Sequence, residues 1–206
     1  EPGLVSAIRQ RVQGSPDLFI EAAAASLNFI TAHDGLTLHD LTLVTSDRHR
    51  SWDCGPDLRL QQLKNYFALL LLSAGTPMWV MGDEFGRTQG GHDNPYNIDG
   101  PTTWVDWSRA ADWRELTNFV RALTALRRAH PPTAFTFHGV GPEVDDTYES
   151  RSIAWSATDL YVMVNAWWEP LTFEVQAPGE WQQVLATAEP DGLTLAPRSI
   201  VVLRRS

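Results

Sequence analysis

Apolar residues recur at helical spacing in three stretches of the chain. They predict a short helix over Leu4–Val12, a second from about Leu58 to Ser73 and a third over Asp112–Ala129. Asp57 is placed to cap the second helix and Gly75 to end it. The apolar positions of the two longer helices are Leu60, Leu63, Phe67 and Leu70, then Trp113, Leu116, Val120, Leu123 and Leu126.

Two short apolar runs lie on either side of the second predicted helix, and each leads into polar residues. Ser26–Ala32 predicts a buried strand that ends at His33-Asp34-Gly35. Met78–Met81 predicts another, which leads into Gly82-Asp83-Glu84. The order strand, loop, helix, strand is that of a parallel α/β sheet. In such sheets, ligands meet the loops at the carboxyl ends of the strands.

The pattern changes after Pro132. A long loop rich in glycine and aromatic residues, from Phe85 to Trp107, precedes the third helix, and short alternating strands follow that helix. Regular short strands separated by turns indicate an antiparallel sandwich or small barrel. We therefore expect one domain over residues 1–131 and a second, all-β domain over residues 132–206. The predicted strands of the second domain are Ser152–Ser156, Leu160–Ala166, Leu171–Gln176, Trp181–Thr187 and Ser199–Arg204.

The charge of the chain limits its partners. Twenty-five acidic residues against 16 Lys plus Arg give a formal net charge of −9. Because phosphate binding requires concentrated positive charge, this argues against a nucleic-acid or anionic-membrane surface and leaves neutral partners such as sugars open. The one cysteine, Cys54, favours a reducing compartment, so we expect a cytoplasmic protein. We also expect no signal peptide and no membrane span, since the longest apolar run is Phe67–Leu72.

Other candidate residues favour ordinary structural roles. The histidines other than His33 lack metal-ligand spacing, so we predict no metal and no cofactor. Arg127-Arg128 near a helix C-terminus fits the helix dipole without requiring a partner. Of the nine tryptophans, Trp79, Trp113 and Trp155 are expected to pack in cores. Trp167-Trp168 adjoin a predicted strand end, so one of them is a candidate for stacking on a sugar ring.

The residues around His33-Asp34 are more informative than the dipeptide itself, which is more often a structural turn. The segment from Asn28 to Asp40 resembles the last conserved catalytic segment of the α-amylase superfamily, in its isoamylase and glycogen-debranching form. Met81–Gln89 is similar to the eighth barrel strand of that family and its loop, and Trp104–Trp107 to the segment that closes this loop. From Val162 onward, the chain is more loosely similar to the family's C-terminal β domain.

This resemblance implies the C-terminal part of a TIM (β/α)8 barrel followed by an antiparallel β-sandwich. It also implies retaining hydrolysis of α-1,6-glucosidic branch linkages in glycogen or a related branched α-glucan. By motif position, Asp34 is the carboxylate that stabilises the transition state, and His33 hydrogen-bonds a hydroxyl of the same sugar. Gln89, Asn94 and Tyr96 are the candidates for lining the substrate groove.

No segment of these residues resembles those that carry the family's nucleophile and acid/base. We therefore expect a portion of a longer hydrolase that is inactive alone, and self-association through unpaired strand edges. Two alternatives stay open: a transferase or branching activity of the same superfamily, and a non-catalytic carbohydrate-binding module.

Overall fold

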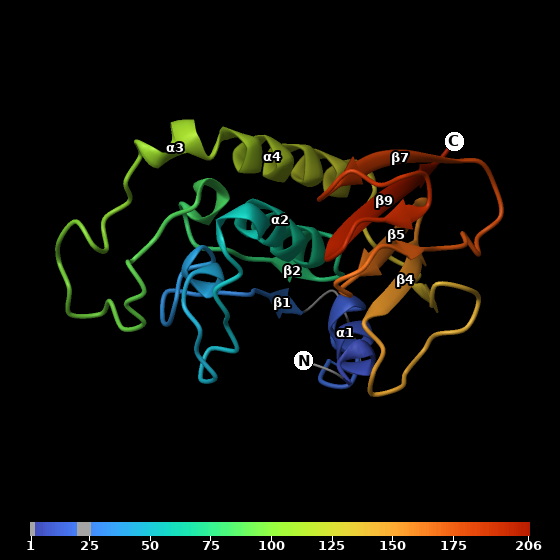
Figure 1. Ribbon diagram of the computed structural model, residues 1–206, viewed down its shortest axis with the longest axis horizontal. Helices are drawn as coiled ribbons and strands as arrows, with labels where there is room; N and C mark the ends of the chain where they lie inside the picture. Colours follow the sequence, from blue (N-terminus) through green and yellow to red (C-terminus); the bar gives the residue numbers. More distant parts are fainter. Residues whose placement is uncertain (1–2, 20–25) are drawn as a thin grey trace. The chain divides into compact units, whose positions relative to one another are not determined.

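The computed structural model describes residues 3–19 and 26–206, which divide into two compact units (Figure 1). The helical unit comprises Leu27–Leu70 and Pro77–Ala125. The sheet unit comprises Glu1–Ser26, Leu71–Thr76 and Leu126–Ser206. The domain boundary at residues 131/132 stays a prediction, and these units place the first helix of the chain with the sheet rather than with the other helices.

Both long helices form at the predicted places. α2 is Pro56–Leu71 and α4 is Arg114–Ala129, preceded by the short α3, Arg109–Asp112. α2 begins two residues earlier than predicted, at a proline, which suits a first helical position because its missing N–H needs no partner there. The apolar stripes are buried as expected, with Leu63, Phe67, Leu116 and Leu123 all at 0% exposure.

The two strands on either side of α2 are much shorter than predicted. β1 is Leu27–Asn28 and β2 is Thr76–Pro77, so the expectation of a buried strand is wrong for most of Ser26–Ala32 and for all of Met78–Met81. Leu27 and Phe29 are each 53% exposed. A strand buried on both faces needs cover on both and partners on both edges. Within residues 3–19 and 26–206, β1 pairs with β2 alone.

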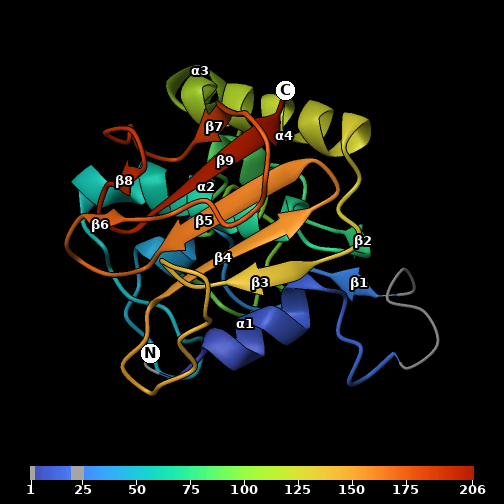
Figure 2. The same cartoon turned by 90° about the vertical axis from the view of Figure 1, so that its right-hand side faces the viewer.

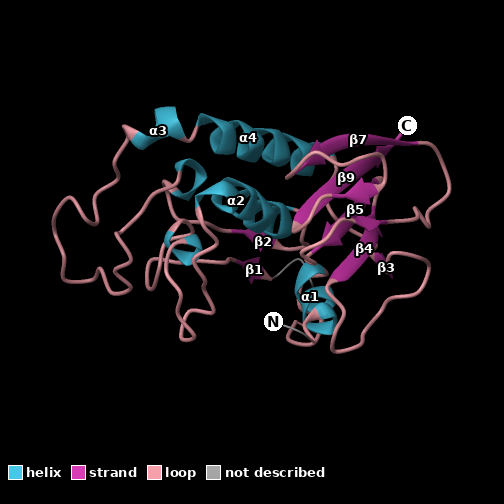
Figure 3. Ribbon diagram, in the orientation of Figure 1, coloured by secondary structure: helices cyan, strands magenta, loops and turns pink. Residues whose placement is uncertain are grey.

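The pairing of β1 with β2 still has the predicted direction. The amide of Thr76 donates to Ser26 O at 2.7 Å, and the amide of Met78 donates to Asn28 O at 2.8 Å. From the first bond to the second, the donor and the acceptor each move two residues toward the C-terminus, which is the pattern of a parallel pair. The loops after the strands contain two 3-10 turns, Asp40–Thr42 and Asp83–Phe85, while residues 86–108 form a long loop without a helix or strand (Figure 3).

The sheet unit holds an antiparallel sheet with the strand order β3-β4-β5-β9-β7, and β6 and β8 form a separate antiparallel pair (Figure 2). A helix, α1, precedes them over Val5–Val12, as predicted. The predicted Leu171 strand is only two residues long, while β3 and β8 were not predicted. The strands are β3 Thr136–His138, β4 Ser152–Ala157, β5 Leu160–Asn165, β6 Leu171–Thr172, β7 Trp181–Ala186, β8 Thr194–Leu195 and β9 Ser199–Arg205.

One core of the sheet unit joins its two sheets. Its members include Tyr161 and Met163, which alternate along β5, and Val201 of β9. These side chains cluster with Phe173 and with Leu195 of β8. Every residue of β5 is buried. Continuous burial along a strand requires cover on both faces, which explains why its sequence is apolar rather than alternating.

Arg127 closes the C-terminal end of α2. Its guanidinium donates to Leu71 O and Ser73 O, each at 2.6 Å, and also to Gly75 O. The last carbonyls of a helix lack partners within the helix, and this side chain supplies them. The prediction that Arg127 needs no partner is therefore wrong.

Candidate functional site

His33 and Asp34 lie on the loop that follows β1. Both side chains are exposed, at 89% and 79%, and His33 Nε2 lies 3.5 Å from Asp34 Oδ2. Asp34 lines a cavity of about 440 Å³. The same cavity is lined by residues 29–32, 35 and 36, and by Leu41, His49, Arg50 and Tyr66. This volume is within the range of small-molecule sites in proteins.

Asp40 is a buried carboxylate that joins the Asp34 loop to the loop after β2. Its Oδ2 accepts hydrogen bonds from the backbone amides of Gln89, at 2.8 Å, and Gly91, at 3.3 Å, and its Oδ1 accepts one from the Thr88 hydroxyl. Burial would raise the pKa of Asp40, but the hydrogen bonds from these groups and from His39 together lower it to about 2. Asp40 is therefore ionised at neutral pH and fixes residues 88–91 against its own turn.

Asp83 is a second fully buried carboxylate, and it joins the two loops at another point. Its Oδ2 accepts a hydrogen bond from the Thr31 hydroxyl at 3.1 Å, and its Oδ1 accepts one from the Leu38 amide at 3.3 Å. Burial raises the pKa of Asp83 to about 6, against the opposing effect of these hydrogen bonds and of the Arg87 charge. The two carboxylate oxygens of Asp83 therefore bind one residue before the His33-Asp34 turn and one residue after it.

A third connection lies at the turn itself. The Gly35 amide donates to Asp93 O at 3.0 Å, and Asp93 Oδ2 lies 2.9 Å from His49 Nε2. Arg48 also donates to Asp93 Oδ2, at 3.1 Å. The hydrogen bond with His49 is the largest of the effects that lower the pKa of Asp93. The turn is thus bound to Asp93, which Arg48 and His49 contact in turn, although the His33 and Asp34 side chains are solvent-exposed.

The three residues predicted to bind substrate occupy different environments. Gln89 is only 2% exposed. Its side-chain nitrogen donates to His92 O at 2.8 Å and to Gly35 O at 3.4 Å. Its side-chain oxygen accepts a hydrogen bond from Arg87 at 2.8 Å. Asn94 is exposed, and Tyr96 is 84% exposed. Gln89 thus supports the loops from inside, while Asn94 and Tyr96 lie on their surface.

The cavity also contains residues that sequence reasoning did not select. His49, Arg50 and Tyr66 line it with Asp34, from the short loop before α2 and from α2 itself. Their sequence neighbourhoods carry no motif, and only the fold brings them to the Asp34 loop. Glu84 accepts a hydrogen bond from the Gly82 amide at 3.0 Å and so closes its own turn.

Within the described part of the chain, no group of three or more His, Cys, Asp or Glu side chains is arranged to hold a metal ion. Among these residues, no helix has the length and apolar character needed to cross a membrane.

Comparison with known proteins gives the family context of this site. No family model matches the chain. It is 37% identical over 183 residues to the glycogen operon protein GlgX homolog of Mycobacterium tuberculosis, covering 75% of this chain and 25% of that protein. It is 31% identical over 233 residues to an isoamylase of a Flavobacterium species, covering 86% of this chain and 30% of the isoamylase. The chain therefore spans about a quarter to a third of the length of these relatives.

Solved structures show the same fold. All of this chain superposes on the apo pullulanase of Paenibacillus barengoltzii with a TM-score of 0.80 and 26% sequence identity, covering 34% of that chain. The complex of this pullulanase with maltohexaose and α-cyclodextrin gives the same TM-score of 0.80, at 24% identity. Together, the sequence and structure comparisons confirm the resemblance that the motif around Asp34 predicted.

Proposed function

We propose, from the premise that this chain is a homologue of the isoamylase-type glycogen debranching enzymes, that it forms part of the active site of such an enzyme. The reaction is hydrolysis of α-1,6-glucosidic branch linkages in glycogen or a related α-glucan, with retention of configuration. The observation that carries the proposal is an exposed Asp34 that lines a cavity while its loop is fixed by two buried carboxylates.

The role of Asp34 follows from the charge that develops during glycoside cleavage. The transition state resembles an oxocarbenium ion, so a carboxylate held near the sugar ring interacts with it more strongly than with the neutral ground state. Such a group accelerates the reaction only if it does not have to reorganise. Asp40 and Asp83 provide this condition. The Asp83 carboxylate binds Thr31 and Leu38 on either side of the Asp34 turn, and the Asp40 carboxylate binds the Gln89 amide in the loop after β2.

His33 is proposed to hydrogen-bond a hydroxyl of the same sugar. The imidazole lies beside the Asp34 carboxylate and is exposed, so it is free to meet a ligand. Asn94 and Tyr96 are proposed to contact sugars further along the groove, and their exposure supports this. The burial and hydrogen bonds of Gln89 support an indirect contribution, through the position of the loop.

We also propose that the helical unit belongs to a (β/α)8 barrel and that the two sheets of the other unit form a β-sandwich domain. The parallel pairing of β1 with β2 around α2 supports the first assignment, and the core shared by the two sheets supports the second. The nucleophile and the acid/base then come from other parts of the native polypeptide, and we expect these 206 residues to release no sugar on their own.

The test is an assay of the native polypeptide that carries this sequence. Incubated with glycogen, it should release linear α-1,4 chains and new reducing ends, and proton NMR should detect the α-anomer first. Longer branches without new reducing ends would instead indicate a transferase, and additional branch points would indicate a branching enzyme. Binding of glycogen with no change in its structure would indicate a carbohydrate-binding module.

A further inference from the structure

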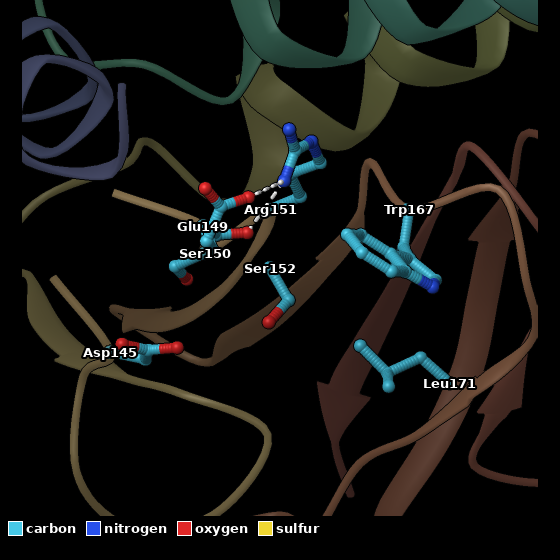
Figure 4. Close-up of a pocket in the computed structure, with 7 residues that line it drawn as sticks. All are labelled: Asp145, Glu149, Ser150, Arg151, Ser152, Trp167 and Leu171. Atoms are coloured by element: carbon cyan, nitrogen blue, oxygen red, sulfur yellow. Dashed lines mark hydrogen bonds and ion pairs between the residues drawn. The ribbon is translucent and has the colours of Figure 1, made fainter. Parts of the chain in front are cut away.

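A second pocket lies in the sheet unit and is separate from the Asp34 cavity. It has a volume of about 180 Å³ and is lined by acidic, hydroxyl, cationic and aromatic side chains. In Figure 4, Asp145 and Glu149 lie on one side of this pocket and Trp167 and Leu171 on the other. At about 30 Å³ per water, it holds on the order of six water molecules, which suits one small ring rather than a buried polymer.

The aromatic wall of the pocket is Trp167, whose indole stacks on the neighbouring Trp168. The ring centroids of Trp167 and Trp168 are 3.8 Å apart and their planes differ by 21°. Trp168 is 51% exposed, so its burial contributes little to folding. The guanidinium carbon of Arg151 lies 5.2 Å from the Trp167 centroid and 5.5 Å from the Trp168 centroid. Exposed aromatic faces of this kind offer apolar area to a ligand at low conformational cost.

The turn that carries the two indoles is held from inside the protein. Asn165 is 1% exposed, and its side-chain oxygen accepts a hydrogen bond from the Trp167 amide at 2.9 Å. Its side-chain nitrogen donates to Glu169 O at 2.9 Å and to Ala196 O at 3.0 Å. A surface turn fixed by a buried side chain is preorganised, which lowers the entropic cost of binding.

The polar groups of the pocket are also fixed, and they favour a neutral ligand. Arg151 Nη1 donates to Glu149 O at 2.7 Å and lies 3.4 Å from its carboxylate. A Thr147 hydrogen bond is the main effect that lowers the pKa of Asp145, so this carboxylate is an ionised acceptor at neutral pH. Two carboxylates beside one guanidinium repel an anion, whereas hydroxyl groups both donate to carboxylates and accept from a guanidinium.

From this geometry we propose that the pocket beside Trp167 and Arg151 is a second saccharide site, which binds one glucose unit of an α-glucan chain. The C–H face of the sugar packs on indole and its hydroxyls meet Glu149, Arg151 and Asp145. The choice of an α-glucan rests on the proposed function, while the choice of a neutral pyranose rests on the pocket itself. A shallow site for one ring binds weakly, but a branched polymer with many chain ends compensates by multivalency.

The experiment measures retention of the protein in native gels that contain glycogen, with titration calorimetry against maltohexaose. We expect Trp167→Ala, which removes the indole that lines the pocket, to reduce retention at least about tenfold, because the stacking of a nucleic-acid base on an aromatic side chain is worth a comparable amount. Arg151→Lys, which keeps the charge but loses the planar fork, should give a smaller loss. Leu193→Ala is the control, since Leu193 is 37% exposed in the same unit and does not line the pocket.

Trp168→Ala is a second variant, since this half-exposed ring adjoins Trp167 without lining the pocket, and it should give a smaller loss than Trp167→Ala. A thermal melt checks that each variant is folded. Asp34→Asn in the native polypeptide is tested in the same gels and should keep its retention while losing hydrolysis. Retention that survives Trp167→Ala in a folded protein would overturn this second site. That outcome does not bear on hydrolysis at Asp34, so the two proposals fail separately.

Discussion

The buried Asp83 carboxyl makes the stability of the protein dependent on pH in a direction opposite to the usual one. Its folded-state pKa is about 6, against 3.8 for an unperturbed carboxyl. Between these values, the unfolded chain releases the proton while the folded chain retains it. The contribution of Asp83 is therefore fully present below about pH 3.8 and is lost as the pH rises through about 6. At about 1.4 kcal/mol per tenfold change in proton affinity, the loss is about 3 kcal/mol by pH 7.

Asp83→Asn should remove this dependence. Asparagine keeps an acceptor for the Leu38 amide and presents an NH2 group to the Thr31 hydroxyl, so both contacts of Asp83 have a replacement. Urea unfolding of wild type and variant at pH 4 and pH 7 measures the effect. The stability of the variant relative to wild type should rise by about 2 kcal/mol between the two pH values, because wild type has already lost part of this contribution at pH 4.

The control is Asp191→Asn, an exposed carboxylate in a turn of the sheet unit, which should change the free energy of unfolding by less than about 0.5 kcal/mol at either pH. If the difference between Asp83→Asn and wild type stays constant within about 0.5 kcal/mol, burial does not control this carboxyl and the reasoning fails.

Two further predictions concern the loops around the site. Asp40→Ala leaves the Gln89 and Gly91 amides without their acceptor. It should therefore lower the free energy of unfolding in urea at pH 7 by at least about 3 kcal/mol. A decrease of less than about 1 kcal/mol would contradict the role of Asp40 in fixing the loop after β2. At Gly86, whose φ is +70°, a Cβ would lie 2.6 Å from the Trp113 ring, so Gly86→Ala should cost about 2–5 kcal/mol. Gly90→Ala is the matched control, with φ +63° and open space, and should cost only about 1–2 kcal/mol; equal losses would refute the steric argument.

Local periodicity predicted the parts of the fold whose burial is determined by their own sequence. α2 and α4 repeat apolar residues every three or four positions, and the strands β4, β5 and β9 are apolar runs between turns. The extent of β1 could not be predicted in this way. Residues 26–32 are as apolar as a buried strand, but the length of a strand depends on partners from elsewhere in the chain.

The site was predictable only as far as its motif extends. The segment from Asn28 to Asp40 identified His33 and Asp34, and the structure shows them exposed on a braced turn. The burial of Asp83 was not predictable, because its partners Thr31 and Leu38 are 52 and 45 residues away in sequence. The same applies to Tyr66, a half-buried residue of α2 that lines the cavity without belonging to a motif.

The central claim is that Asp34 acts on the transition state and not on the bound substrate. Steady-state kinetics of debranching by the native polypeptide with Asp34→Asn, with Asp191→Asn as control, measure this directly. We predict that kcat falls by at least about 10²–10³ with little change in KM. An unchanged kcat, or a loss confined to KM, would contradict the account.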